Sequence, residues 1–377
     1  MKVAILKEVR DAEPRVAATP ETVKKIKALG PNVVVEAGAG ADSYFADADY
    51  QAAGAEIAND AGAAVSGADV VLKVLRPTEQ ELGQMKAGTV VAAIMNPLGD
   101  AAATEAAAKA DVNTFAMEFM PRITRAQSMD VLSSQSNLAG YKAVVDGAAE
   151  FHRAFPMMMT AAGTIPAARV FVMGVGVAGL QAIATARRMG AIVTATDVRA
   201  ATKEQVESLG ANFIMVEDDE GADAETSGGY AKEMSDDYKA KQAELIAGHI
   251  GKQDIVITTA LIPGRPAPVL VTEDHLKSMK PGSIIVDLAV EQGGNCPLSK
   301  PGELAVVHGV KLMGYLNVPG RLAYDASSLY ARNLLNFISL LIDKESGDLT
   351  IDWEDEIVTG TCLTRDGKII HPRLTGE

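Results

Sequence analysis

Three glycines stand at the spacing of a dinucleotide-binding turn. Gly174, Gly176 and Gly179 form a G-x-G-x-x-G pattern directly after an apolar run at residues 168–173. The first glycine permits a tight turn, the second lets the backbone approach a pyrophosphate, and the third lets a helix pack closely on the preceding strand. Free N–H groups at the start of that helix favour an anion. The pattern therefore predicts a site for the diphosphate of a dinucleotide.

Asp197 ends the next apolar run, 197 − 179 = 18 residues after the last glycine. This spacing is close to the roughly 20 residues expected for an acid that binds the ribose 2′-hydroxyl. Its carboxylate would repel a 2′-phosphate, which favours NAD(H) over NADP(H). Arg199 favours the opposite choice, because an arginine nearby could bind that phosphate.

A polar cluster lies within residues 121–143, between an apolar run and an expected helix at 137–155. Its polar residues are Arg122, Arg125, Gln127, Asp130, Ser133, Ser134, Gln135, Ser136 and Asn137. One interpretation is an inter-domain connection whose serines cap a helix. The other is a loop that offers hydrogen-bond partners to a carboxamide and a ribose.

Two further stretches could contribute to a nucleotide site. Residues 217–226 contain six acids and are followed by a glycine pair and Tyr230, which suits either a mobile lid or a solvated acidic loop. Ala260 and Leu261 follow an expected strand at 254–259, at the end where ligands bind in parallel sheets.

Other chemistries lack their residues. The five histidines and the two cysteines, Cys296 and Cys362, show no metal-ligand spacing. Neither a G-x-S-x-G elbow nor a phosphate-binding G-x-x-x-x-G-K-[ST] loop occurs. We therefore expect no metal site.

The elements that position these residues alternate between strand and helix. Expected strands in the first third are 3–6, 33–36, 70–74, 90–94 and 112–117, and later ones include 211–216 and 283–288. Expected helices include 20–29 and 329–342, and Arg365-Asp366-Gly367 predicts a hairpin between strands at 359–363 and 368–371. The predicted fold class is α/β, with two Rossmann-like, doubly wound parallel-sheet domains and a cleft between them.

Composition limits the partners and the compartment. A chain of 377 residues favours two domains, and a net charge of −14 argues against nucleic acid and anionic membrane surfaces as direct partners. No run approaches the ~18 apolar residues of a membrane span. The charged start MKVAILKEVR is unlike a signal peptide, and two distant cysteines form no disulfide framework, so we expect a cytoplasmic location.

Several blocks resemble a known family. RAQSMD, GGYAKEM, TTALIPGRPAP and VDLAVEQGGNCP, together with the glycine turn, are similar to the NAD(H)-binding domain I, or alpha-1 subunit, of proton-translocating NAD(P) transhydrogenase. The resemblance extends over essentially the whole chain. Its superfamily includes alanine dehydrogenase. That enzyme shares the KExRxxExRVAxTP pattern near the start of the chain and the VDLAVEQGG segment.

This resemblance implies an activity and a set of partners. It implies a homodimer, with one lobe formed by residues 1–132 and 322–377 and an NAD-binding Rossmann lobe formed by 133–321. It implies direct hydride transfer between NADH and NADP(H), the latter bound on domain III of a partner subunit. Membrane-spanning subunits would couple that transfer to proton translocation and hold this chain on the cytoplasmic face of the inner membrane.

The resemblance also implies site residues. Arg122, Gln127, Asp130 and Ser133 match the loop that holds the nicotinamide and its ribose. Tyr230 matches the tyrosine of a loop that closes over the nucleotide. Further expected cofactor-binding positions are Val177, Asp197, Val198, Arg199, Gly229, Gln242, Ala260 and Leu261.

Two alternatives remain. In an alanine dehydrogenase-like enzyme, Arg15 and Lys73 match the substrate clamp and Glu291 matches a carboxylate, but Asn96 lies in the segment where that enzyme has its histidine. Without an imidazole, the proton transfer of that reaction lacks its base. An NAD-sensing binding module would need Asp197 but not the loop from Arg122 to Ser133.

Overall fold

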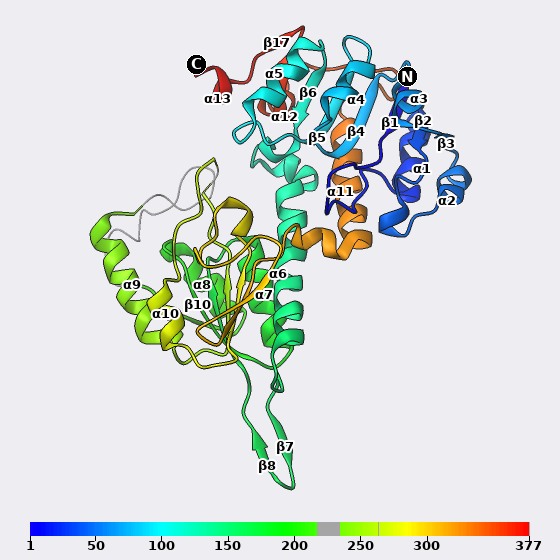
Figure 1. Ribbon diagram of the computed structural model, residues 1–377. Coiled ribbons are helices and arrows are strands. Elements are labelled where there is room, and N and C mark those ends of the chain that lie inside the picture. Colours follow the sequence, from blue (N-terminus) through cyan, green and yellow to red (C-terminus); the bar gives the residue numbers. More distant parts are fainter. Residues whose placement is uncertain (217–233, 263, 377) are drawn as a thin grey trace. The chain divides into compact units, whose positions relative to one another are not determined.

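The structure, a computed structural model, describes residues 1–216, 234–262 and 264–376 (Figure 1). The chain divides into two compact units, residues 1–135 with 320–377 and residues 136–319. Each unit is built on a mostly parallel β-sheet with apolar cores on both faces. The predicted α/β class with two Rossmann-like sheets is confirmed.

The first unit contains an eight-stranded sheet in the order β17-β16-β6-β5-β4-β1-β2-β3. Six strands are parallel, and β16 and β17 add an antiparallel edge. The strands are β1 Lys2–Ile5, β2 Asn32–Glu36, β3 Glu56–Ala58, β4 Val70–Leu75, β5 Val90–Ile94, β6 Asn113–Ala116, β16 Cys362–Arg365 and β17 Lys368–Ile369. The helices are α1 Pro20–Ala28, α2 Asp47–Ala52, α3 Ala61–Val65, α4 Glu79–Gln84, α5 Ala101–Lys109, α11 Ala323–Ile338, α12 Glu356–Thr361 and α13 Pro372–Thr375.

The second unit contains a seven-stranded sheet in the order β11-β10-β9-β12-β13-β15-β14, parallel except for β14. The strands are β9 Arg169–Met173, β10 Ile192–Thr196, β11 Asn212–Phe213, β12 Ile255–Thr258, β13 Ile284–Asp287, β14 Leu304–Val307 and β15 Val310–Met313. The helices are α7 Val177–Arg188, α8 Lys203–Ser208, α9 Asp236–Ile250 and α10 Glu273–Ser278.

Alternate strand residues enter different cores, which explains the unbroken apolar runs in the sequence. On β9, Val170 and Val172 belong to one cluster, whereas Phe171 and Met173 belong to the cluster on the opposite face. A strand buried on both faces has no polar side. These strands are therefore recognisable in the sequence, and their carboxyl ends position the candidate site.

Helix α6 (Val131–Glu150) starts in the first unit and ends in the second. The expected range of 137–155 was wrong at both ends. The helix begins earlier because the Asp130 carboxylate accepts the Ser133 backbone N–H at 2.8 Å, as a capping residue does.

None of the helices in the described part of the chain combines the length and the apolar character that a membrane span needs.

The C-terminal segment differs from the expected strand at 359–363. Helix α12 occupies most of that range, because Asp355 accepts the Ile357 N–H at 2.7 Å and starts the helix. The predicted hairpin is confirmed, but its first strand is β16, which follows α12. Asp366 and Gly367, with φ of 50° and 73°, join β16 to β17. The strand expected at 211–216 is only the two residues of β11.

A second hairpin, which the sequence did not predict, leads into β9. Strands β7 (Met158–Thr160) and β8 (Gly163–Ile165) pair with each other in a sheet of their own, and all six residues are exposed. In Figure 1 this hairpin extends away from the seven-stranded sheet of its unit.

Candidate functional site

Two of the three glycines are required by the protein's own packing. Gly174 has φ of +98°, and a Cβ there would lie 2.7 Å from the Thr259 hydroxyl oxygen. A Cβ on Gly179 would lie 2.0 Å from the Gly174 carbonyl oxygen, so α7 could not pack this closely on the turn. These are the roles predicted for the first and third glycines.

Gly176 has different surroundings. It precedes α7 with φ of −85°, which any residue adopts, and a Cβ there would have no described atom within 4 Å. No side chain among the described residues caps α7. The space beside Gly176 and the uncapped helix start suit an anionic group from outside the chain, as a pyrophosphate would be.

Asp197 follows β10 and is buried beside this turn, with 7% of its surface exposed. One carboxylate oxygen accepts the Val175 N–H at 2.7 Å and an Arg199 Nη at 2.8 Å. The other accepts the backbone N–H and Nε–H of Arg199 at 2.9 and 2.8 Å.

This geometry has a consequence for the predicted ribose contact. A carboxylate has about four lone-pair positions, and four protein donors already point at that of Asp197. A ribose hydroxyl must therefore replace or share a bond from Arg199, whose guanidinium also donates to the Val175 carbonyl at 3.1 Å. The two residues form one unit, which the sequence did not reveal.

The loop after β12 meets the glycine turn. The Thr259 hydroxyl donates to the Gly174 carbonyl at 2.9 Å, and Ala260 and Leu261 follow directly. Leu261 is 37% exposed and Val177, at the start of α7, is 39% exposed, so both apolar side chains are open to contact.

The other expected cofactor-binding positions are placed as follows. Gln242 is half-buried on α9, and Val198 packs beside a small cluster that contains Tyr238. Gly229, Tyr230 and the lid expected at residues 217–230 lie outside the described residues.

In the first unit, the polar cluster divides into two groups. Ser134 donates to the Asn333 side chain on α11 at 2.8 Å, and Gln135 accepts from Arg15 at 2.9 Å. Arg125 pairs with Asp355 at 2.7 Å, and this hydrogen bond lowers the pKa of Asp355. These contacts hold the segment to its own unit.

Four other members are those that the resemblance assigned to the nicotinamide. Arg122 and Gln127 are exposed; Arg122 precedes the short helix Thr124–Met129, and Gln127 lies within it. Asp130 accepts from both the N–H and the hydroxyl of Ser133, at 2.8 and 2.6 Å. Asp130 and Ser133 therefore cap α6, which is a structural role that each has regardless of any ligand.

A buried charge cluster surrounds Arg15 and Lys73. Arg15 pairs with Glu13 at 2.5 Å, and Lys73 pairs with Glu81 at 2.8 Å. Glu8 lies 3.6 Å from Lys73, and one of its carboxylate oxygens is buried without a hydrogen-bond partner. Burial raises the pKa of Glu8 to about 6.

The two positions that the alanine dehydrogenase alternative concerns for proton transfer are both exposed. Asn96 is exposed with φ of 49°, and its backbone N–H, like that of Met95, donates to the Glu118 carboxylate. Burial raises the pKa of Glu118. Glu291 is exposed in the turn Val290–Gln292.

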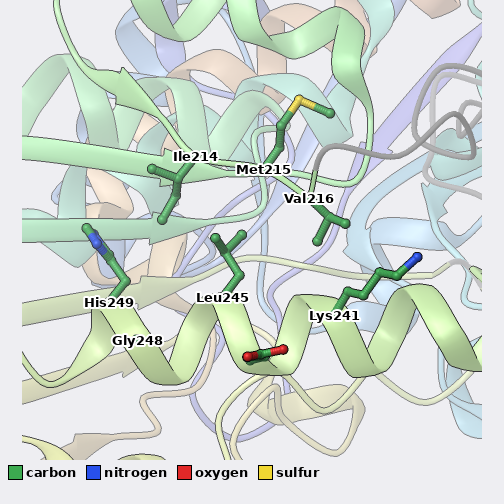
Figure 2. A pocket seen from close by; sticks show the side chains of 8 residues that line it. Ile214, Met215, Val216, Lys241, Leu245, Gly248 and His249 are labelled. Carbon is green, nitrogen blue, oxygen red and sulfur yellow. The ribbon is translucent and has the colours of Figure 1, made fainter.

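A cavity of about 550 Å³ lies elsewhere in the second unit, between the edge strand β11 and α9 (Figure 2). It is lined by Ile214, Met215, Val216, Lys241, Glu244, Leu245, Gly248 and His249. His249 hydrogen-bonds Thr194 and Gln253, and burial lowers its pKa. None of the predicted site residues that the structure describes lines it. The described residues contain no cluster suited to a metal ion.

Known proteins match the whole chain. Residues 4–139 match the family "Alanine dehydrogenase/PNT, N-terminal domain", and residues 143–372 match its C-terminal domain. The first of the separate parts of NAD(P) transhydrogenase subunit alpha in Rhodospirillum rubrum is 60% identical over all of both chains. A crystal structure of transhydrogenase from Sinorhizobium meliloti is 54% identical with a TM-score of 0.86, covering 99% of this chain and 100% of that one. An L-alanine dehydrogenase structure is 25% identical with a TM-score of 0.81, covering 100% and 98%.

Proposed function

The chain belongs to the alanine dehydrogenase/PNT family, among the relatives of the NAD(P) transhydrogenase alpha subunits, and on that basis we propose its function. It is the NAD(H)-binding component of a proton-translocating NAD(P) transhydrogenase. The observation that carries the proposal is the open space beside Gly176, at the uncapped start of α7 and next to Asp197. That arrangement fits a dinucleotide diphosphate with its ribose.

The chain's own residues bind and orient the cofactor. When bound, NAD(H) supplies a nicotinamide that gives or accepts a hydride. The start of α7 binds the diphosphate, and Asp197 selects a ribose 2′-hydroxyl over a 2′-phosphate. The exposed Arg122 and Gln127 orient the nicotinamide, while Asp130 and Ser133 fix the helix end beside them.

The second nucleotide, NADP(H), binds on a partner subunit. Direct transfer between two nicotinamides depends on their positions and needs no protein acid or base. The name of the Rhodospirillum rubrum relative describes it as one numbered portion of subunit alpha, which supports the existence of further chains. We propose that membrane-spanning partners couple the transfer to proton translocation and hold this chain on the cytoplasmic face.

The chain also forms a homodimer in this proposal. The hairpin β7–β8 supports it, because a two-stranded hairpin is marginally stable in water and this one exposes Met158, Met159 and Ile165. A second copy that covers this hairpin would bury those side chains.

An alanine dehydrogenase-like activity is the weaker candidate. Arg15 and Lys73 neutralise buried carboxylates, which accounts for both cations without a substrate. The segment that would need a histidine has Asn96, whose side chain has no titratable proton.

Nucleotide titrations and a reconstituted assay test the proposal. The purified chain should bind NADH and should not reduce NAD with alanine as substrate. Addition of an NADP-loaded partner subunit should start transhydrogenation between the two nucleotides. Alanine-dependent NADH formation by the chain alone would overturn the assignment.

Gln127→Ala tests the nicotinamide loop most cleanly, because the side chain is exposed and the change should not affect folding. Hydride transfer should fall by up to about 100-fold with little change in NADH affinity. Arg332→Ala, an exposed change on α11 of the same unit, is the control and should leave the rate unchanged. Equal losses of rate and affinity in Gln127→Ala would make the loop a general anchor instead.

A further inference from the structure

Asn295 is a fully buried amide that joins two loops at the carboxyl edge of the second sheet. Its side-chain oxygen accepts the Ala260 N–H at 3.0 Å. Its NH₂ group donates to the Ala260 carbonyl at 2.9 Å and to the Pro268 carbonyl at 2.8 Å. Both backbone groups of Ala260 are therefore held by one side chain.

The backbone of Asn295 is itself held rigidly. Asp287, at the end of β13 and 1% exposed, accepts the N–H groups of Asn295 and Cys296 at 3.1 and 3.0 Å. The same carboxylate accepts the Ala289 N–H at 3.0 Å. The Asn295 side chain therefore extends from a fixed base across to the loop after β12.

The loop it holds is the one that meets the glycine turn. Thr259 donates to the Gly174 carbonyl, and the Ala260 nitrogen would lie 3.1 Å from a Cβ on Gly174. A shift of Ala260 by a few tenths of an ångström would therefore change the positions of both the glycine turn and Leu261.

We propose that Asn295 is a positioning residue for nucleotide binding, which fixes the backbone of Ala260 so that Leu261 and the glycine turn keep a binding-competent arrangement. This inference rests on the proposed NAD(H) function. An amide is required because the position needs one acceptor and two donors at once. A carboxylate offers no donor, and an apolar side chain offers neither.

The test is NADH titration of Asn295→Leu, which keeps the number of side-chain heavy atoms and removes the hydrogen-bonding groups, and of Asn295→Ser, in case the leucine variant fails to fold. NADH Kd should rise at least about tenfold in Asn295→Leu, because three buried hydrogen bonds are lost, and less in Asn295→Ser. Binding is measured below the unfolding temperature of each variant and expressed per folded protein.

Gln253→Leu is the matched control. Gln253 is 3% exposed, precedes β12 rather than following it, and bonds His249 through its amide at 2.9 Å. It should lose stability with NADH Kd unchanged. Unchanged affinity in both Asn295 variants, or an equal loss in the control, would overturn the inference. Failure of the unaltered chain to bind NADH would instead overturn the proposed function.

Discussion

Gly176 and Gly179 lie three positions apart in the sequence, yet their surroundings predict different effects of an alanine substitution on stability and on NADH binding. Gly179→Ala should destabilise the second unit by about 1–3 kcal/mol, because its Cβ would overlap the Gly174 carbonyl. Gly176→Ala should leave stability nearly unchanged but weaken NADH binding roughly tenfold or more, because its methyl enters the space assigned to the diphosphate.

Thermal unfolding and NADH titration of the two variants separate these effects. Each variant is the control for the other, since both add one methyl group to the same turn. Undiminished NADH affinity in Gly176→Ala would place the diphosphate elsewhere.

Asp197 and Arg199 predict how the nucleotides are distinguished. Asp197→Ala should reduce the preference for NADH over NADPH by at least about tenfold, because the charge that repels a 2′-phosphate is gone. Arg199→Ala should keep the preference, because that charge remains. Calorimetric titration with both nucleotides measures each ratio. If Arg199→Ala abolished NADPH binding in the Asp197→Ala background, Arg199 would be a phosphate ligand, as the sequence alternative proposed.

At the scale of elements, the hairpin β7–β8 gives the clearest prediction. Replacing Met157, Met158 and Met159 by serine should convert the proposed dimer to a folded monomer, because these side chains are exposed in the described chain. Sedimentation measures the oligomeric state. Val306→Ser, also exposed but on the edge strand β14, should leave the dimer intact. A triple variant that remained dimeric would exclude the hairpin as the interface.

The elements that could be predicted share one property. Residue types that lie close together in the sequence determine each of them. The apolar run of β9, the glycine turn, α7 and β10 follow from residue types within about thirty positions. Helix α12 was mistaken for a strand because threonines favour strands, whereas the cap at Asp355 decides the outcome. Hairpin β7–β8 has no typical turn residue between its strands, only Ala161 and Ala162.

Side-chain contacts that form only in the folded chain explain what the sequence could not reveal. Asp197 and Arg199 were both identified, but their shared bonds depend on side-chain conformations. Asn295 reaches Ala260 across 35 residues, and no motif marks it. The Asn295–Ala260 contact depends on the pairing of β12 with β13, which places the two loops side by side.

At the scale of the whole molecule, Glu8 predicts how stability depends on pH. Burial raises its pKa from 4.5 to about 6, so the folded chain binds this proton more tightly than the unfolded chain. The resulting stabilisation is complete below pH 4.5 and is lost as the pH rises through about 6. Its size is about 2 kcal/mol. Glu8→Gln should remove this component from the pH dependence of unfolding.

The single tryptophan allows the pH dependence of unfolding to be measured in the first unit alone. Trp353 packs against the core of that unit, and its ring centroid lies 6.2 Å from that of Phe115. Its fluorescence during urea unfolding therefore reports on that unit. The nearby groups Lys73, Glu13, Glu81 and Arg15 are unchanged in the variant. Glu56→Gln, exposed on β3, is the control and should retain the wild-type pH dependence. An unchanged profile in Glu8→Gln would mean that Glu8 ionises normally.

The first unit is assembled from both ends of the chain, and this sets an order of events during synthesis. Strand β16 pairs with β6, and the bonded Thr114 and Thr364 are 250 residues apart. The second unit is fully synthesised at residue 319, 365 − 319 = 46 residues before β16 is complete. At about 5–20 residues per second, a ribosome needs about 2–9 s for that interval. During those seconds the second unit is complete while the sheet of the first unit still has an unpaired β6 edge, and that edge is where wrong pairing with other chains would begin.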